Sequence, residues 1–225
     1  MNRPDGFAAD SLQVRQAARV VVLLSGRGSN FQAIVEAQLP IDIVAVISNR
    51  PQAAGLTYAR ERGLTAVALD HTAHPDRVAF DALLADAIEA HQPDLVVLAG
   101  YMRILSPAFI ARFEGRLLNI HPSLLPMFPG LKTHERALEE GVKIHGCTVH
   151  FVTAQLDHGP IVIQAAVPVH ADDTPASLSA RVLAQEHRIY PQAIRWFAEG
   201  RLLNQQGRVN VRGDSTSQAV LSSGA

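Results

Sequence analysis

RVVVLLSGRGSN, residues 19–30, joins a strand-length apolar run to a loop of small residues. A continuous β-branched run is typical of a parallel strand that is buried on both faces. Gly26 and Gly28 allow a tight turn after it, and a helix that starts near Asn30 would present free backbone N–H groups to that turn. The stretch therefore predicts the first strand, loop and helix of an α/β fold.

The same order of strand and helix repeats through the first half of the chain. Further strands are predicted at residues 41–48, 65–69, 95–99 and 116–120, and helices at 30–37, 53–62, 76–91 and 107–113. In the helix at 76–91, one buried face is predicted from the spacing of Val78, Phe80, Leu83, Leu84 and Ile88. This alternation predicts parallel βαβ units.

The second half of the chain has a different pattern. Apolar runs at 144–153 and 161–169 flank a turn that contains Asp157, which predicts an antiparallel strand pair at the sheet edge. A helix is predicted from Pro175, with Thr174 as its N-cap and Pro191 kinking or dividing it. The Ser-, Gly- and Ala-rich stretch from Asp214 is predicted to be disordered. The fold expected is α/β: a Rossmann-like, mostly parallel twisted sheet with an antiparallel C-terminal strand pair and flanking helices.

Composition narrows the classes of function. The chain has 225 residues, of which 48% are hydrophobic and 18% are charged, as in a globular protein with a sizeable core. A formal net charge of −1 gives no electrostatic basis for binding nucleic acid or an anionic membrane. The single Cys147 excludes an internal disulfide framework, and residues 1–18 lack the apolar core of a secretory signal. We expect a cytoplasmic protein that binds small molecules, as a monomer or a homodimer.

A carboxamide and an imidazole stand two residues apart in LLNIHPSLLP, residues 117–126. Alternation along a strand sends Asn119 and His121 to the same side, and Pro122 ends the strand. The amide can donate to an oxyanion and the ring can move protons. Asp157, on the later turn, would orient the imidazole and favour its charged form. The alternative is structural: the same residues can cap a strand and satisfy a turn.

The loop at residues 25–30 has the features of a phosphate site. Its glycines and the following helix start offer backbone N–H groups to an anion. It is neither G-x-G-x-x-G nor a Walker motif, so a phosphomonoester suits it better than a dinucleotide. On the last long helix, Glu186 lies in an apolar stripe with Leu178 and Val182, where a carboxylate needs a partner or a polar ligand. An ordinary βα turn and a Glu that reaches solvent are the alternatives.

A second ligand surface is predicted at AGYMRIL, residues 99–105, which leaves the apolar strand 95–99 at its carboxyl end. Met102, Ile104 and Leu105 would form an apolar wall beside exposed backbone polar groups, a combination that suits a flat, hydrogen-bonding heterocycle. The same segment would also serve as a connection that packs on itself.

Six segments together resemble one enzyme family, the folate-dependent glycinamide ribonucleotide formyltransferases: SGRGSNFQAI, LAGYMRILSP, RLLNIHPSLLP, HGCTVHFV, LDHGPI and QEHRIYP. The resemblance runs from Arg19 to Arg201. NIHPSLLP is shared by several folate-dependent formyl-transfer enzymes, whereas the S-G-x-G-S-N loop selects this branch. The resemblance implies transfer of the formyl group of 10-formyltetrahydrofolate to the amine of glycinamide ribonucleotide, in de novo purine biosynthesis, with no metal.

The resemblance also implies roles for particular residues. It makes Asn119, His121 and Asp157 catalytic, and gives the substrate phosphate to Gly28, Ser29 and Asn30, with Glu186 at the ribose hydroxyls or the amine. It assigns the folate site to Met102, Arg103, Ile104, Leu105, Asn119 and Val152, with Arg77 at the glutamyl or benzoyl part. On composition alone, Arg77 reads as a surface charge. His158 stands where the family often has Gly, which adds a second ring beside Asp157.

The resemblance also gives the divisions of the chain a meaning. We expect an extension at 1–18, a formyltransferase domain at 19–204 and a tail at 205–225. Within the domain, residues 19–118 would form the nucleotide- or phosphate-binding half, and 119–204 the catalytic and folate-binding half.

Three rival functions use parts of the same pattern. A formyltetrahydrofolate hydrolase would share Asn119, His121 and Asp157 but would not need the loop at 25–30. A tRNA formyltransferase would need a basic RNA-binding region, for which the length and charge leave no room. A non-catalytic phosphoribosyl- or folate-binding protein would tolerate loss of the three catalytic residues, and all three are present.

Overall fold

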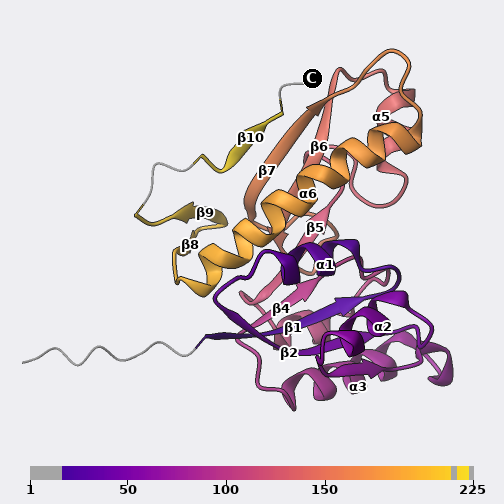
Figure 1. Ribbon diagram of the computed structural model, residues 1–225, viewed down its shortest axis with the longest axis vertical. Coiled ribbons are helices and arrows are strands. Elements are labelled where there is room, and N and C mark those ends of the chain that lie inside the picture. The colour runs from indigo at the N-terminus through magenta and orange to yellow at the C-terminus, as the bar shows by residue number, and fades with distance from the viewer. Residues whose placement is uncertain (1–16, 214–216, 223–225) are drawn as a thin grey trace, which may run out of the picture.

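The computed structural model describes residues 17–213 and 217–222. Its main sheet has eight strands in the order β10-β7-β6-β5-β4-β1-β2-β3 (Figure 1). The strands from the first half are β1 Ala18–Leu24, β2 Ile41–Ser48, β3 Ala66–Ala68, β4 Leu95–Leu98 and β5 Leu117–His121. The later ones are β6 Ile144–Phe151, β7 Ile161–Pro168 and β10 Ala219–Leu221.

The strand directions confirm the predicted fold class. β3, β2, β1, β4 and β5 pair in parallel, whereas β6 is antiparallel to both β5 and β7. The helices are α1 Ser29–Glu36, α2 Ala54–Glu61, α3 Arg77–Glu89, α4 Pro107–Arg112, α5 Thr133–Glu139 and α6 Pro175–Ala198, with a 3-10 turn at His71–Ala73. No helix in the described ranges is long and apolar enough to cross a membrane.

Alternating residues of the strands build two cores, one on each face of the sheet. Val20, Val22 and Leu24 of β1 belong to the core beneath α1, α2 and α6, whereas Val21 and Leu23 belong to the core beneath α3 and α4. Helix α6 packs against α1, β6 and β7 (Figure 1). Every β1 residue from Val20 to Leu24 is fully buried, as the apolar run predicts.

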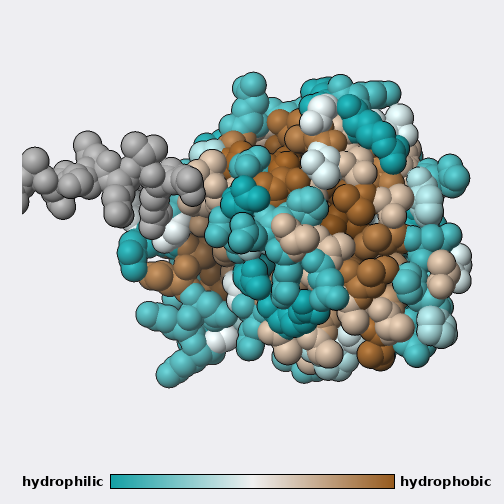
Figure 2. Space-filling model, turned by 90° about the horizontal axis from the view of Figure 1, so that it is seen from below, coloured by the Kyte–Doolittle hydropathy of each residue, from teal (hydrophilic) through white to brown (hydrophobic). Residues whose placement is uncertain are grey.

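The buried face of α3 differs in part from the predicted one. Its buried residues are Phe80, Asp81, Leu84, Ala85 and Ile88, whereas Val78 is 59% exposed and Leu83 is 39% exposed. Val78 precedes Phe80 by two residues, which turns it by about 200° around the helix, away from the sheet. Hydrophobic residues also gather on the surface at the end of the molecule where α3 lies (Figure 2).

Pro191 does not divide the last long helix, so that part of the prediction was wrong. α6 is continuous over Pro175–Ala198, with Pro191 inside it and Thr174 as the predicted N-cap. Pro191 removes one backbone donor, but the neighbouring Tyr190, Ala193 and Ile194 are fully buried. Burial on both sides of the proline holds the helix together.

The C-terminal region contains more structure than the sequence predicted. β8 Leu202–Gln205 and β9 Arg208–Val211 form a hairpin, and β10 pairs in parallel with β7. The Gln218 side chain donates to the carbonyls of Val162 (2.7 Å) and Val209 (3.0 Å), which ties this segment to the domain. The prediction of disorder from Asp214 was therefore wrong for residues 217–222; the rest of that stretch lies outside the described residues.

Candidate active site

His121 is the last residue of β5 and is 6% exposed. Its Nε2 lies 3.0 Å from the carbonyl oxygen of Phe128. A carbonyl only accepts hydrogen bonds, so Nε2 carries the proton and donates it. Its Nδ1 lies 3.5 Å from Oδ2 of Asp157. The backbone therefore engages Nε2, and a carboxylate faces Nδ1.

Asp157 is held by the backbone of the loop that follows β5. Its Oδ2 accepts a hydrogen bond from the N–H of Gly130 at 2.8 Å. Asp157 itself has φ of 49°, in the left-handed region that non-glycine residues rarely adopt. The loop after β6 thus turns sharply at this residue and directs its carboxylate toward His121.

Asn119 shares the sheet face of His121, as alternation predicted, and pairs with β6. Its Nδ2 lies 3.1 Å from Nε2 of His150, the residue opposite it in the β5–β6 register. The Nδ1 of His150 lies 3.0 Å from the Phe151 carbonyl, so Nδ1 donates and Nε2 accepts from Asn119. Burial lowers the pKa of His150, which favours this neutral form. One Asn119 amide hydrogen stays available for a ligand.

Asn119, His121, His150 and Asp157 therefore form one group. Besides facing His121, Asp157 places Oδ1 4.0 Å from Nε2 of His150. Leu118 and Ile120 point into the core beneath α6, which sends the two polar β5 side chains to the opposite face, where loops cover them. The sequence predicted that Asn119, His121 and Asp157 come together, and the structure adds His150 to them.

Residues that the sequence did not single out hold the loop after β5. The Thr148 hydroxyl donates to the Ser123 carbonyl at 2.7 Å and accepts from the Leu125 N–H at 3.0 Å. Gln164 of β7 donates to the Leu125 carbonyl at 2.9 Å. Thr148 lies two positions before His150 on β6, so strand alternation would have placed it on this face.

The loop between β1 and α1 has the backbone that the sequence predicted. Gly28 has φ of 75° and is the N-cap of α1, and a Cβ there would lie 3.2 Å from the Cα of Gly55. Ser29 begins α1. A Cβ at Gly26 would meet nothing within 4 Å, so the loop is open at that residue. The structure thus places a left-handed glycine at a helix N-terminus, where free backbone N–H groups favour an anion, and phosphate binding by this loop stays a prediction.

Asn30 and Glu186 are joined directly. The Asn30 Nδ2 donates to Oε2 of Glu186 at 2.7 Å, and both residues are buried. Burial raises the pKa of Glu186, while the hydrogen bond from Asn30 lowers it. The Asn30 Oδ1 is also buried and has no hydrogen-bond partner among the described residues. The side chain of Asn30 thus holds the Glu186 carboxylate, so only the backbone N–H of Asn30 would be offered to a ligand of the loop.

The predicted folate loop combines exposed and buried residues. Met102 is 63% exposed and Ile104 is 60% exposed, whereas Leu105 is buried. The Arg103 guanidinium lies over the Phe80 ring, 4.9 Å from its centre. Val152 packs against the same core as Leu105, and Arg77 is exposed at the start of α3. An apolar wall is present, and the assignment of these residues to folate stays a prediction.

Asp81 anchors the end of this loop, which the sequence did not predict. It is 1% exposed, and its Oδ2 accepts from the Ser106 N–H at 2.6 Å. Asp81 Oδ1 and the Tyr101 hydroxyl are both buried without a hydrogen-bond partner among the described residues. Burial raises the pKa of Tyr101, which keeps it protonated.

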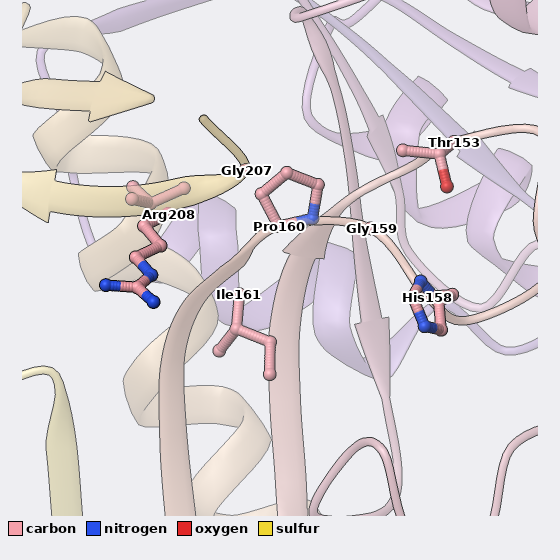
Figure 3. Close-up of a pocket in the computed structure, with 8 residues that line it drawn as sticks. Thr153, His158, Gly159, Pro160, Ile161, Gly207 and Arg208 are labelled. Carbon is pink, nitrogen blue, oxygen red and sulfur yellow. The ribbon is translucent and has the colours of Figure 1, made fainter. Parts of the chain in front are cut away.

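A pocket of about 660 Å³ lies beside the loop that carries Asp157 but contains none of the four grouped residues. Figure 3 shows His158, Gly159 and Pro160 on one side of it and Gly207 and Arg208 on the other. His158 is exposed, so the extra ring lies outside the buried group. In residues 17–213 and 217–222, no group of three or more His, Cys, Asp or Glu side chains is placed to hold a metal ion.

Comparison with known proteins identifies relatives along most of the chain. The formyl transferase family matches residues 18–194. Phosphoribosylglycinamide formyltransferase of Escherichia coli (strain K12) is 53% identical over 187 residues, covering 81% of this chain and 88% of that protein. Human trifunctional purine biosynthetic protein adenosine-3 is 45% identical over 87% of this chain, but only 20% of that longer protein is covered.

A similar solved structure comes from an enzyme of the same kind as these relatives. Glycinamide ribonucleotide transformylase 1 from Symbiobacterium toebii is 53% identical with a TM-score of 0.84, covering 87% of this chain and 94% of that chain. The chain belongs to the formyl transferase family. Within that family, it is similar to phosphoribosylglycinamide formyltransferases over most of its own length and theirs.

Proposed function

We propose that the protein transfers the formyl group of 10-formyltetrahydrofolate to the amine of glycinamide ribonucleotide, giving formylglycinamide ribonucleotide and tetrahydrofolate. The reaction belongs to purine biosynthesis, and we expect it in the cytoplasm. The observation that carries the proposal is the group in which Asp157 faces His121 at 3.5 Å and Asn119 pairs with His150 at 3.1 Å. Membership of the formyl transferase family gives that group its chemistry.

The reaction forms one C–N bond and breaks another. The amine nitrogen attacks the formyl carbon, and the carbonyl oxygen becomes an oxyanion in the tetrahedral intermediate. The second Asn119 amide hydrogen and a protonated Nδ1 of His121 would donate to this oxygen, and one donor typically supplies ~10²–10³ in rate. The intermediate then collapses, N10 of the folate leaves with the electron pair, and the proton lost by the amine passes to N10.

Asp157 has two roles in this scheme. Its carboxylate stabilises the positive charge on His121 at 3.5 Å, in a site where both side chains are about nine-tenths buried and water screens the interaction weakly. Its anchoring to Gly130 keeps that charge in place when substrates enter. His121 then serves as the proton carrier between amine and N10, directly or through a water that Asp157 holds.

The two substrates would bind on either side of this group. The N–H groups at Gly28, Ser29 and Asn30 suit the phosphate, and Glu186 suits the ribose hydroxyls or the amine. The apolar side chains of the folate loop suit the pterin. The hydrolase alternative leaves the loop that is open at Gly26 and the buried Asn30–Glu186 pair without a role, so the transferase is favoured.

Mass spectrometry of the product tests the proposal. The protein is incubated with 10-formyltetrahydrofolate that carries ¹³C in the formyl group, together with glycinamide ribonucleotide. We expect the label on the ribonucleotide amine, in an amount equal to the tetrahydrofolate formed. Label recovered as formate instead would reject the transferase in favour of the hydrolase.

A further inference from the structure

Ser25 follows the last residue of β1 and is 3% exposed. Its hydroxyl donates to Oδ1 of Asn49 at 2.6 Å and accepts from the backbone N–H of Met102 at 2.8 Å. Its own N–H donates to the Gly100 carbonyl at 3.1 Å. One serine thus connects the carboxyl ends of three neighbouring strands, β1, β2 and β4.

The segments that Ser25 joins belong to different substrates. On one side it continues directly into Gly26 and the loop assigned to the ribonucleotide phosphate. On the other side it holds Met102, the first residue of the segment assigned to folate. Asn49 extends the same network, because its carbonyl oxygen lies 2.8 Å from Nδ1 of His71 in the turn after β3. Ser25 is therefore common to both loops: one continues from its backbone at Gly26, and the other donates a hydrogen bond to its hydroxyl through the Met102 N–H.

We propose that Ser25 is a positioning residue that sets the donor loop and the acceptor loop in register, so that the amine and the formyl carbon meet correctly. The proposal rests on the proposed function, because that function assigns the loops to two reactants. Ser25 acts through the two loops and touches neither reactant. A misplacement of about 1 Å between reacting groups costs as much as ~10²-fold in rate, so a single shared hydrogen-bonding centre has a kinetic effect beyond its effect on stability.

The test compares two buried serines at the ends of adjacent strands. Ser48, the last residue of β2, is fully buried, but among the described residues its hydroxyl bonds only within its own turn, donating to the Arg50 carbonyl at 3.0 Å and accepting from the Arg50 N–H at 3.1 Å. Ser48→Ala therefore removes a comparable hydroxyl that is hydrogen-bonded to neither of the two loops. Melting temperature, kcat and both KM values are measured for Ser25→Ala, Ser48→Ala and the parent protein.

We expect Ser25→Ala to raise both KM values several-fold and to lower kcat by ~10-fold. Ser48→Ala should lower the melting temperature to a similar extent while each kinetic constant stays within about twofold of the parent. The proposal is overturned if Ser25→Ala changes the KM of one substrate only, or if Ser48→Ala reproduces its kinetic losses. Asn49→Ala, which removes one partner of the same hydroxyl, should act in the same direction and less strongly, and is used if Ser25→Ala does not fold.

Amide hydrogen exchange separates this proposal from the function on which it rests. If the parent protein does not transfer formyl groups, the proposed function fails, but the linkage between loops is still measured. In Asn49→Ala or Ser25→Ala, we expect faster exchange at residues 26–30 and at 101–106, and no change in either segment in Ser48→Ala. Acceleration in only one of the two segments would contradict the shared role of Ser25.

Discussion

Oδ2 of Asp157 lies 3.5 Å from Nδ1 of His121 and at the same time accepts the N–H of Gly130 at 2.8 Å. The backbone of the loop after β5 therefore fixes the position of the carboxylate that faces the imidazole. The same loop, at Phe128, accepts the Nε2 proton of His121. Both ring nitrogens of His121 are thus oriented by one loop, whose side chain anchors are Thr148 and Gln164 on β6 and β7.

We expect His121→Ala to lower kcat by at least ~10² with the fold retained, because general acid–base and oxyanion contributions are each of that size. Asn119→Ala and Asp157→Ala should have effects of the same order. Steady-state kinetics, with circular dichroism to confirm folding, provide the measurement. Turnover near the parent rate in folded His121→Ala would refute the mechanism.

Because the three residues act as a unit, the double variant His121→Ala, Asp157→Ala should lose much less than the product of the two single losses. Once His121 is gone, Asp157 has no charged imidazole to stabilise, because burial lowers the pKa of His150 and favours its neutral form. A double-mutant cycle on kcat measures the difference. Strict multiplication of the two effects would show that Asp157 works independently of His121.

Substitution of the two glycines in the loop at residues 25–30, which we assign to the phosphate, should have different effects. Gly26→Ala should fold normally, since its Cβ meets nothing within 4 Å, and should raise the KM of the ribonucleotide while the KM of folate stays unchanged. Gly28→Ala should lose ~1–2 kcal/mol of stability, because φ of 75° disfavours a side chain and Gly55 lies 3.2 Å away. Chemical unfolding and steady-state kinetics measure both effects. A matching rise in the folate KM in Gly26→Ala would mean that the loop is misassigned.

We expect the Asn30–Glu186 pair to make ribonucleotide binding sensitive to pH. Ionised Glu186 is the better acceptor for ribose hydroxyls or the amine, so KM should rise as pH falls through the pKa of Glu186. Asn30→Ala removes the hydrogen bond that lowers this pKa, and the rise in KM should then begin at higher pH. Glu186→Gln is the control and should abolish the pH dependence. An unchanged profile in Asn30→Ala would exclude Glu186 as the titrating group.

Stability should fall at acid pH partly through His145. It is 1% exposed, its ring lies 5.8 Å from that of Phe128, and burial lowers its pKa to about 4. Below pH 6.5 the unfolded chain binds a proton at this residue that the folded chain does not, so stability decreases as pH falls from 6.5 to about 4. This difference in the pKa of His145 between the unfolded and folded chain corresponds to a loss of roughly 3 kcal/mol in the free energy of unfolding. His145→Gln should flatten the unfolding free energy over this range, and an unchanged slope would assign the effect to other groups.

The sequence predicted secondary structure correctly where the local pattern and the tertiary environment favour the same element. β2 was predicted with its observed bounds, and the N-cap Thr174 was correct, because an apolar run between turns and a Thr-Pro helix start are local signals. Strand alternation placed Asn119 and His121 together for the same reason.

Long-range contacts explain what the sequence did not predict. β10 is three residues long and is defined by pairing with β7, which no local pattern records. The Asp81–Ser106 and Ser25–Met102 hydrogen bonds join residues 25 and 77 positions apart, so their partners become visible only in the fold. Val78 and Leu83 fit an apolar spacing, but the direction of the sheet decides which face of α3 is buried.

The dependence of folate deformylation on the acceptor distinguishes a formyltransferase from a hydrolase. Release of deformylated folate from 10-formyltetrahydrofolate is followed with saturating glycinamide ribonucleotide, with its dephosphorylated analogue, and with neither. We predict fast release only with the intact ribonucleotide, because holding amine and formyl carbon together supplies several kcal/mol of the barrier and the phosphate loop positions that amine. Comparable rates in all three reactions would contradict formyl transfer to the ribonucleotide and show that the protein is a hydrolase.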